Sequence, residues 1–369
     1  MRINKLLTVV LLLCSACVSQ QQVQKEKVVL AYVTSWTTIM PDPNYLTHIN
    51  YAFGHVNATF NGIMINRPPR EGSNVNDGRA TSEDRLRSIV ELKKQKPSLK
   101  VMLSVGGWGS GNFSEMAADE TNRLAFAAEC KRVIQQFGLD GIDLDWEYPT
   151  SSAARISSSP EDKNNFTLLM RDIRNSIGRD KLLTFASASN AGYVDFKAIE
   201  PYVDFVNIMT YDIASNGSAH HAGLFRSELT GAPGRNFSCE ESVDAHVAAG
   251  IPIQRLVLGM PFYGHGRDQV PGYTDYRNII NRRGVLGIVT RDGETILEGH
   301  KEMWDAMAQA PYWVDADGKM VMSYETPRSI AIKCEWLKQK GMLGAMYWDY
   351  NADDSEGSLR KAVYNGVMK

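Results

Sequence analysis

Eight apolar runs rich in β-forming residues recur along the chain, with amphipathic helical segments between them. Most are near-continuous hydrophobic stretches, as expected when both faces of a parallel sheet are covered. The predicted strands are Val28–Val33, His48–Phe53, Lys100–Val105, Gly141–Trp146, Lys181–Ser187, Phe205–Thr210, Arg255–Met260 and Gly344–Trp348. Eight strands alternating with helices favour an α/β fold of the (β/α)8 TIM barrel type over residues 28–365. A doubly wound open sheet is disfavoured, because no Gly-x-Gly-x-x-Gly turn follows the first strand.

The segments between these runs carry recognisable helix starts and stops. Gly138 and Gly341 follow two apolar-periodic stretches, and Thr326-Pro327 has the form of an N-cap followed by a first-turn proline. The predicted helices are Glu83–Lys94, Glu120–Phe137, Phe166–Ile177, Glu240–Ala249 and the segment from Thr326 to Gly341.

The connection between Met260 and Gly344 is too long for an ordinary crossover. Inside it we predict three strands and one helix, namely strands at Gly284–Thr290, Tyr312–Val314 and Met320–Tyr324 and a helix at Gly299–Ala310. Residues 265–325 are therefore expected to form a small α+β insertion on the C-terminal face of the barrel, as one wall of a cleft.

The N-terminus has the pattern of a signal peptide over residues 1–17. Two basic residues precede the apolar core Leu6–Leu13, which is too short to span a bilayer. Cys14-Ser15-Ala16-Cys17 resembles a lipoprotein cleavage box, so Cys17 is the expected acylated residue and 18–27 a polar tether. Ordinary secretory cleavage and release is the alternative. We expect export across the inner membrane of a bacterium and lipid anchoring in the envelope, on its periplasmic side or at the cell surface.

Composition argues against several classes of partner. The formal net charge is -2 and no basic cluster of five or more residues occurs, so nucleic-acid binding is not expected. After the leader only Cys130, Cys239 and Cys334 remain, too few and too widely spaced for a disulfide framework or a metal cluster. His220 and His221 adjoin each other without a third ligand at useful spacing. We expect a monomer without metal or cofactor.

The run from Asp140 to Pro149 carries the chemistry. Side chains alternate across a strand, so Asp143, Asp145 and Glu147 project to one side and the apolar residues between them to the other. Neighbouring carboxylates repel each other, and the usual relief is for one of them to hold a proton near neutral pH. The strand is therefore predicted to supply a general acid.

Four other predicted strands end in polar, aromatic or glycine-rich residues, among them the seventh, which leads into Tyr263-Gly264. Together with Asp140-x-x-Asp143-x-Asp145-x-Glu147, the motifs Ser104-x-Gly106-Gly107, Met209-x-Tyr211-Asp212 and the late Trp348 resemble glycoside hydrolase family 18. The chitinase branch, with an α+β insertion between strands seven and eight, is the most similar. The resemblance implies a retaining hydrolase of β-1,4-linked N-acetylglucosamine polymers such as chitin or its oligomers, acting without a cofactor.

The resemblance also implies roles for single residues. Glu147 would be the general acid and base, Asp145 would hold the 2-acetamido group of the sugar, and Asp143 would share a proton or hydrogen bond with Asp145. Tyr211 would donate to the acetamido oxygen and Asp212 would bind the distorted sugar. The residues expected to contact substrate are Tyr32, Phe53, Gly106, Gly107, Trp108, Tyr148, Met209, Met260, Tyr263 and Trp348.

The sequence supports substrate assistance on physical grounds as well. The carboxylates beside Glu147 lie on its own strand, so none is evidently placed across the sugar as a nucleophile. Related enzymes often carry an arginine after the Tyr-Gly of strand seven; here His265-Gly266-Arg267 follows, and Arg267 is the expected substitute. An endo-β-N-acetylglucosaminidase acting on glycoprotein glycans or peptidoglycan would use the same chemistry at Asp143, Asp145 and Glu147. A non-catalytic surface glycan-binding protein is the third alternative.

Overall fold

The computed structural model describes residues 26–65, 82–231, 237–268, 270–280 and 300–369. The predicted signal peptide, most of the tether and the strand predicted at Gly284–Thr290 lie outside these ranges. Among the described residues, no helix combines the length and hydrophobicity needed to cross a membrane.

Eight parallel strands close into a barrel. Each pairs with the next along the sheet, and β1 pairs with both β14 and β2, which completes the ring. The strands are β1 (Val28–Thr34), β2 (His48–Val56), β4 (Lys100–Gly106), β5 (Gly141–Asp145), β6 (Leu182–Ser187), β7 (Phe205–Ile208), β8 (Leu256–Pro261) and β14 (Gly344–Trp348). The short β3 (Ile63–Met64) pairs antiparallel with the end of β2. The (β/α)8 prediction is confirmed.

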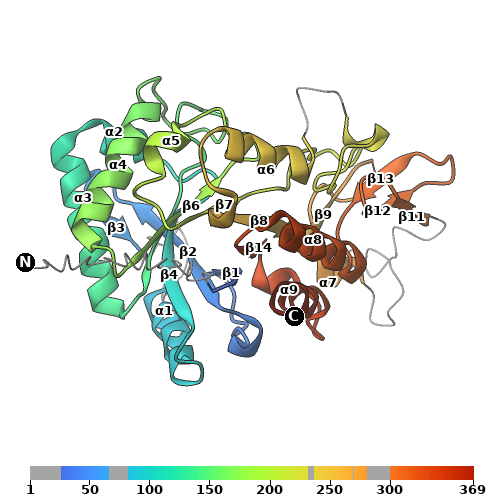
Figure 1. Cartoon of the computed structure of the whole chain (residues 1–369), viewed down its shortest axis with the longest axis horizontal. Coiled ribbons are helices and arrows are strands. Elements are labelled where there is room, and N and C mark those ends of the chain that lie inside the picture. Colours follow the sequence, from blue (N-terminus) through green and yellow to red (C-terminus); the bar gives the residue numbers. More distant parts are fainter. Residues whose placement is uncertain (1–25, 66–81, 232–236, 269, 281–299) are drawn as a thin grey trace, which may run out of the picture.

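Helices surround this barrel (Figure 1). They are α1 (Ser82–Glu91), α2 (Phe113–Ala118), α3 (Glu120–Phe137), α4 (Asp162–Ile177), α5 (Phe196–Ile199), α6 (Cys239–Ala248), α8 (Pro327–Lys340) and α9 (Ser358–Met368). Single turns of 3-10 helix occur at Pro43–Tyr45, Leu92–Lys94, Glu228–Thr230, Ile253–Arg255 and Tyr350–Ala352. Capping follows the sequence signals: Thr326 forms a capping box at the start of α8, and Gly138 and Gly341 end α3 and α8 in the left-handed conformation.

The largest part of the core lies between the strands and the helices. Ile142, Leu144 and Trp146 belong to it, whereas the carboxylates that alternate with them face the barrel interior. Trp146 stacks on Phe113, with ring centroids 5.3 Å apart. The predicted two-sided division of this strand is therefore confirmed. The three cysteines among the described residues, Cys130, Cys239 and Cys334, are free thiols buried in the fold.

A second, antiparallel sheet lies between β8 and β14 in the sequence and beside one edge of the barrel in space (Figure 1). It contains β9 (Tyr263–Gly266), β10 (Thr274–Asp275), β11 (Lys301–Asp305), β12 (Ala310–Val314) and β13 (Met320–Ser323), with the helical turn α7 (Tyr276–Ile279). Trp313 and Met322 lie in its own small core. β9 begins two residues after β8 ends, so this sheet is rooted directly at the C-terminal end of the barrel.

The helix predicted at Gly299–Ala310 is wrong. The segment instead forms β11, which pairs with β12 from Lys301 opposite Val314 to Asp305 opposite Ala310. Asp305 accepts backbone hydrogen bonds from Met307 and Ala308 and so stabilises the turn between the strands. The Glu, Met and Ala residues here favour a helix only locally, and pairing with the neighbouring strand overrides that preference.

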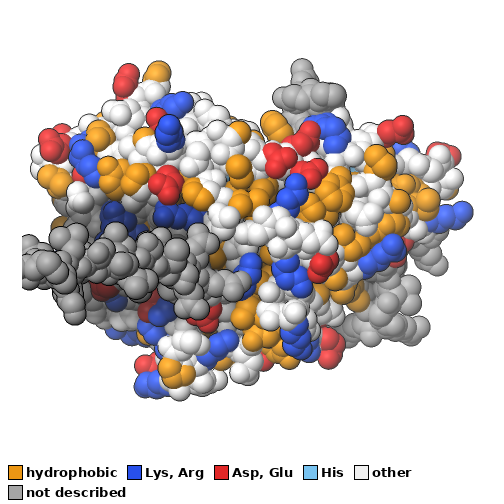
Figure 2. All heavy atoms as spheres, viewed as in Figure 1, with side chains coloured by type: hydrophobic (Ala, Val, Ile, Leu, Met, Phe, Trp, Pro, Cys, Tyr) orange, Lys and Arg blue, Asp and Glu red, His pale blue; other side chains and the backbone are white. Residues whose placement is uncertain are grey.

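Charges of both signs are interspersed over the face shown in Figure 2. This agrees with the near-neutral composition of the chain. Over the described residues visible in this view, Lys and Arg side chains form no extended basic surface.

Candidate active site

A cavity of about 340 Å³ opens at the C-terminal ends of the barrel strands. Both polar and aromatic side chains line it, from six of the eight barrel strands or the loops that follow them, and from the second sheet. The lining residues are Tyr32, Trp36, Phe53, Gly106, Gly107, Trp108, Asp145, Glu147, Met209, Tyr211, Asp212, Tyr263, Tyr273 and Trp348. This is the end of the barrel at which loops of this fold assemble catalytic groups.

Two glycines at the end of β4 allow a close approach of neighbouring chain. Gly106 has φ +134°, and a Cβ atom there would lie 1.9 Å from the carbonyl oxygen of Asp145. A Cβ atom on Gly107, at φ +91°, would lie 2.6 Å from the ring of Phe53. The Gly-Gly pair is therefore required by the packing of this end of the barrel, and the backbone N–H of Gly107 donates to the Asp145 carbonyl at 2.8 Å.

Three carboxylates, Asp143, Asp145 and Glu147, lie on β5 or just after it. Asp143 is the deepest of the three and is fully buried. Its Oδ2 accepts hydrogen bonds from the Tyr32 hydroxyl at 3.0 Å and the Ser104 hydroxyl at 2.8 Å. Its Oδ1 accepts from the Thr184 hydroxyl at 2.5 Å and the Asn207 amide at 3.1 Å. Burial raises the pKa of Asp143, and these four donors offset part of that effect.

Asp145 faces the cavity with one oxygen unsatisfied. Its Oδ1 is buried and has no hydrogen-bond partner among the described residues. Burial raises the pKa of Asp145 well above its ordinary value, and the charges of Glu147 and Asp143 raise it further. A buried acceptor without a donor is costly, so Asp145 is suited to bind a ligand group that supplies one.

Glu147 follows β5 and projects into the same cavity. Burial raises the pKa of Glu147 to about 7; a hydrogen bond with Tyr148 lowers it and the charge of Asp212 raises it. A carboxyl group with a pKa near neutrality can donate a proton and later take one back. Glu147 therefore has a pKa that suits acid–base chemistry at neutral pH.

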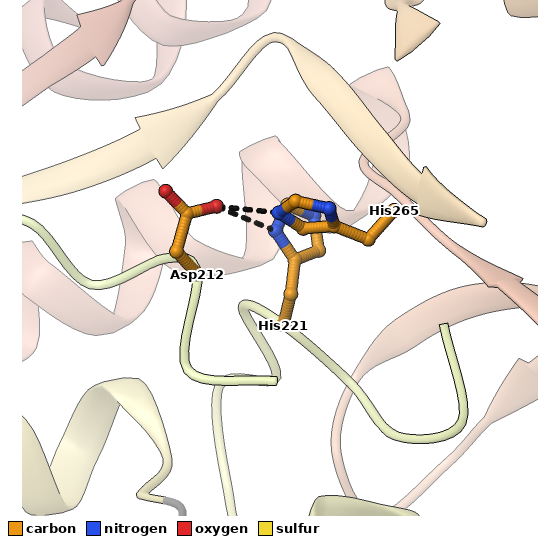
Figure 3. Close-up of side chains that lie close together, drawn as sticks. All are labelled: Asp212, His221 and His265. Carbon is orange, nitrogen blue, oxygen red and sulfur yellow. Dashed lines mark hydrogen bonds and ion pairs between the residues drawn. The ribbon is translucent and has the colours of Figure 1, made fainter. Parts of the chain in front are cut away.

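Asp212 enters from the loop after β7 and meets groups from the second sheet. Its Oδ1 accepts hydrogen bonds from the Tyr263 hydroxyl and from Nε2 of His265, both at 2.6 Å. Nδ1 of His221 lies 3.8 Å from the same oxygen (Figure 3). Burial alone would raise the pKa of Asp212, but its two histidine neighbours and Tyr263 hold it well below the ordinary value.

His265 is held as a donor on both ring nitrogens. Nδ1 lies 2.5 Å from the carbonyl oxygen of Gly272, and Nε2 faces the Asp212 carboxylate. Both partners can only accept, so both nitrogens carry protons and the ring is cationic. Burial lowers the pKa of His265, but the Asp212 carboxylate outweighs this and leaves the pKa raised.

Aromatic rings form the floor of the cavity. Trp348 stacks on Phe53 with centroids 5.5 Å apart and an interplanar angle of 18°, and it lies 5.8 Å from Tyr32. Trp36 and Trp108 line the cavity and are 65% and 63% exposed. Broad rings beside a few fixed carboxylates match the two characters of a sugar, whose C–H faces stack and whose hydroxyl groups form hydrogen bonds.

Comparison with known proteins places the chain in a family. A family model described as "Glycosyl hydrolases family 18" matches residues 28–353. The chain belongs to glycosyl hydrolase family 18. The recognition of this family from the strand-end motifs is confirmed.

Named relatives in the family are chitinases. Chitinase A1 of Niallia circulans is 32% identical over 88% of this chain and 55% of its own length. Probable chitinase 2 of Drosophila melanogaster is 30% identical over 91% of this chain and 74% of its own length. The chain thus spans little more than half of Chitinase A1.

Solved family 18 structures share the architecture. A family 18 N-acetylglucosaminidase from Paenibacillus barengoltzii is 33% identical, with a TM-score of 0.74 over 92% of this chain and 100% of that one. The chitinase domain of the spore coat protein CotE from Clostridium difficile is 31% identical, with a TM-score of 0.61 over 95% of this chain and 93% of that one.

Most family 18 site residues predicted from the sequence line the cavity, but three expected contacts do not. Met260 is fully buried in the core between strands and helices, because alternation along β8 turns it outward from the barrel. Tyr148 is not among the lining residues, and its ring centroid lies 6.4 Å from that of Trp108. Arg267 pairs with Asp268 at 3.0 Å, outside the lining set, and His265 contacts Asp212 instead.

The structure also adds site residues that the motifs do not indicate. Trp36 lies two residues after the end of β1, close to the strand ends on which the motifs lie. Tyr273 stacks on Tyr263 with centroids 4.4 Å apart, and it arrives through the second sheet. His221 and His265 belong to segments far apart in the sequence, so their approach to Asp212 depends on tertiary structure alone.

Proposed function

We propose that this chain is a retaining glycoside hydrolase that cleaves β-1,4 bonds between N-acetylglucosamine units of chitin or chitooligosaccharides. The observation that carries the proposal is Glu147, a cavity carboxyl group whose pKa is raised to about 7. Beside it, Asp145 presents an unsatisfied buried oxygen and Trp348 offers an apolar face. The chitinases among the family relatives support the substrate class.

In the proposed reaction Glu147 transfers its proton to the glycosidic oxygen as the C1–O bond breaks. The carbonyl oxygen of the substrate's 2-acetamido group bonds to C1 from the opposite side, with Asp145 accepting its N–H and Tyr211 donating to its oxygen. The Glu147 carboxylate then takes a proton from water, whose oxygen attacks C1 and displaces the acetamido oxygen. Two inversions at C1 leave the product with retained configuration.

Among the described residues that line the cavity, Asp212 is the one carboxylate that does not come from β5 or the residues just after it; it lies in the loop after β7. A conventional retaining enzyme would use such a group as nucleophile. Here its Oδ1 already accepts hydrogen bonds from Tyr263 and His265, which suits a fixed sugar-binding group. The substrate's acetamido group is therefore the proposed nucleophile.

The deciding experiment compares fully N-acetylated and fully de-acetylated chitooligosaccharides of equal length. We expect reducing ends only from the N-acetylated series, with the β-anomer appearing first by NMR. Equal cleavage of both series would overturn substrate assistance, and cleavage of neither would overturn the hydrolase proposal. The Glu147→Gln variant serves as the inactive control.

A second candidate follows from one comparison. The Paenibacillus barengoltzii protein, 33% identical and covered over its full length, is an N-acetylglucosaminidase. Release of single sugars from chain ends, or of glycans from glycoproteins or peptidoglycan, would use the same carboxylates. Product analysis on a chitin hexamer, a high-mannose glycoprotein and peptidoglycan separates these activities. A non-catalytic glycan-binding protein would bind the hexamer and release nothing.

We further propose that the chain acts as a monomer exported across the inner membrane and anchored in a bacterial envelope through acylated Cys17, facing the periplasm. The support is the sequence alone: an apolar core at Leu6–Leu13 followed by Cys14-Ser15-Ala16-Cys17. Mass spectrometry of the mature N-terminus tests this, and a free amino terminus after cleavage would point to release instead.

A further inference from the structure

His221 is an unusual residue for a protein interior. Its side chain is fully buried, and neither ring nitrogen has a hydrogen-bond partner among the described residues. An imidazole nitrogen without a hydrogen-bond partner keeps a lone pair available for a transition-metal ion.

The nitrogen Nδ1 of His221 points toward two further ligand atoms (Figure 3). These are Oδ1 of Asp212, 3.8 Å away, and Nε2 of His265, and all three atoms lie within 4.8 Å of one another. Zinc ligands at about 2.0–2.1 Å from the ion are separated by about 3.3–3.5 Å in tetrahedral geometry. The 2.6 Å contact between His265 and Asp212 would need to open by less than about 1 Å as the metal replaces the proton between them.

The outer partners of this cluster are those of a metal site. Nδ1 of His265 faces the Gly272 carbonyl at 2.5 Å, which fixes its proton there and aims Nε2 at the cluster. The Tyr263 hydroxyl donates to Asp212 and orients the carboxylate. Histidine ligands in proteins are typically held by such a carbonyl, and ligating carboxylates by such a donor.

We propose that Asp212, His221 and His265 form a binding site for one zinc ion, and that the bound ion excludes sugar from the cavity. Two imidazoles and one carboxylate are ligands that zinc accepts, whereas calcium and magnesium prefer oxygen alone. The side chain of Asp212 is 52% exposed to the cavity, so the fourth position of the ion faces the space proposed for substrate. The exclusion of sugar rests on the proposed glycosidase function; the zinc site does not.

Calorimetric titration with zinc chloride tests the site directly. The wild-type chain should bind one zinc per molecule, and calcium or magnesium chloride should give no saturable binding. The variants His221→Gln and His265→Gln should each lower the affinity for zinc at least about tenfold. Tenfold is the smallest loss typical even for residues that only hold a metal ligand in place. His300→Gln removes a histidine outside the cluster and should bind zinc as wild type does. Thermal unfolding checks that each variant is folded.

Two results would overturn the metal site: no saturable zinc binding by the wild type, or undiminished binding by folded His221→Gln.

A second titration then follows tetra-N-acetylchitotetraose binding to Glu147→Gln by tryptophan fluorescence. If zinc and sugar exclude each other, zinc at ten times its own Kd should raise the apparent Kd for the sugar about tenfold by mass action. Unchanged sugar affinity with zinc bound overturns the exclusion. If the sugar fails to bind without zinc, the glycosidase proposal fails while the zinc titration still stands.

Discussion

The hydroxyl of Tyr32 in β1 donates a hydrogen bond to Oδ2 of Asp143 in β5, at 3.0 Å, across the interior of the barrel. Tyr32 also lines the cavity and lies 5.8 Å from Trp348, so one residue joins the buried acid to the cavity floor. Asp143 therefore links strands on opposite sides of the barrel through hydrogen bonds. Its loss should lower the free energy of unfolding.

The first prediction concerns Asp143→Asn. The substitution puts an amide N–H₂ where two donors now point at a carboxylate oxygen, and a donor facing a donor leaves a buried group unsatisfied. We expect the free energy of unfolding in urea to fall by about 1–3 kcal/mol. Asp244→Asn, at an exposed position on α6, should leave it unchanged. Equal stability of the two variants would contradict this account of the hydrogen-bond set.

The second prediction concerns Glu147→Gln, which keeps the shape of the side chain but removes its titratable proton. Turnover of chitooligosaccharides should fall by at least about 10²–10⁴-fold, the usual contribution of a general acid and base. Affinity for the same oligosaccharide, measured by calorimetry, should stay within a few fold of wild type. Full turnover by the variant is incompatible with the proposed role.

The third prediction is a pH profile. A group with pKa about 7 that must be protonated gives a kcat/KM that falls as pH rises through about 7. Because the hydrogen bond from Tyr148 lowers the pKa of Glu147, Tyr148→Phe should move this limb to higher pH. If the fall in kcat/KM occurs at the same pH in Tyr148→Phe, a group other than Glu147 controls this part of the pH profile.

The raised pKa has a matching consequence for stability. The folded protein binds the Glu147 proton more tightly than the unfolded chain does, so this contribution is fully present below pH 4.5 and is lost as pH rises through about 7. Urea unfolding of wild type against Glu147→Gln across this range should show the wild type losing stability relative to the variant.

The parts of the fold that depend on local pattern could be predicted from the sequence. Continuous apolar runs marked every barrel strand, and the alternation from Asp143 to Glu147 showed which carboxylates share a face. The wrong helix at Gly299–Ala310 shows the limit of this approach, because pairing with β12 is absent from local propensity.

The site shows the same division. Residues inside strand-end motifs, such as Glu147 and Trp348, were predictable because their positions follow from the barrel. Tyr273 and His265 reach the cavity through the second sheet, whose register the sequence does not specify. Met260 was misplaced because membership of a strand-end motif says nothing about the face to which a side chain points.

The fourth prediction concerns Trp348→Ala. A ring that stacks on the sugar before and during reaction contributes equally to both states, so its loss should raise KM with little change in kcat. We expect roughly a tenfold rise, in line with about 0.5–1.5 kcal/mol for an aromatic contact beyond its buried area. Trp304→Ala is the matched control, because Trp304 lies on β11 beneath the Arg328 guanidinium and outside the cavity. A similar rise in both variants would argue against a sugar-binding role for Trp348.

The fifth prediction concerns the buried ion pair between Lys333 of α8 and Glu325, which are 0% and 1% exposed. Lys333 also donates to the carbonyl oxygen of Ala222, the residue after His221, so it links α8 to the loop beside the cavity. Lys333→Met leaves the Glu325 carboxylate buried without its cation, and we expect a loss of about 3–5 kcal/mol in the free energy of unfolding.

The double variant Lys333→Met with Glu325→Met removes both charges and should recover most of that loss, because a buried pair replaced by apolar side chains is often neutral in stability. Lys340→Met provides the surface comparison. Its partner is Glu240 and both side chains are about one-third exposed, so the cost should stay below about 1 kcal/mol. Urea unfolding measures all three variants. If Lys333→Met costs no more than Lys340→Met, the buried pair does not hold α8 to the cavity loop.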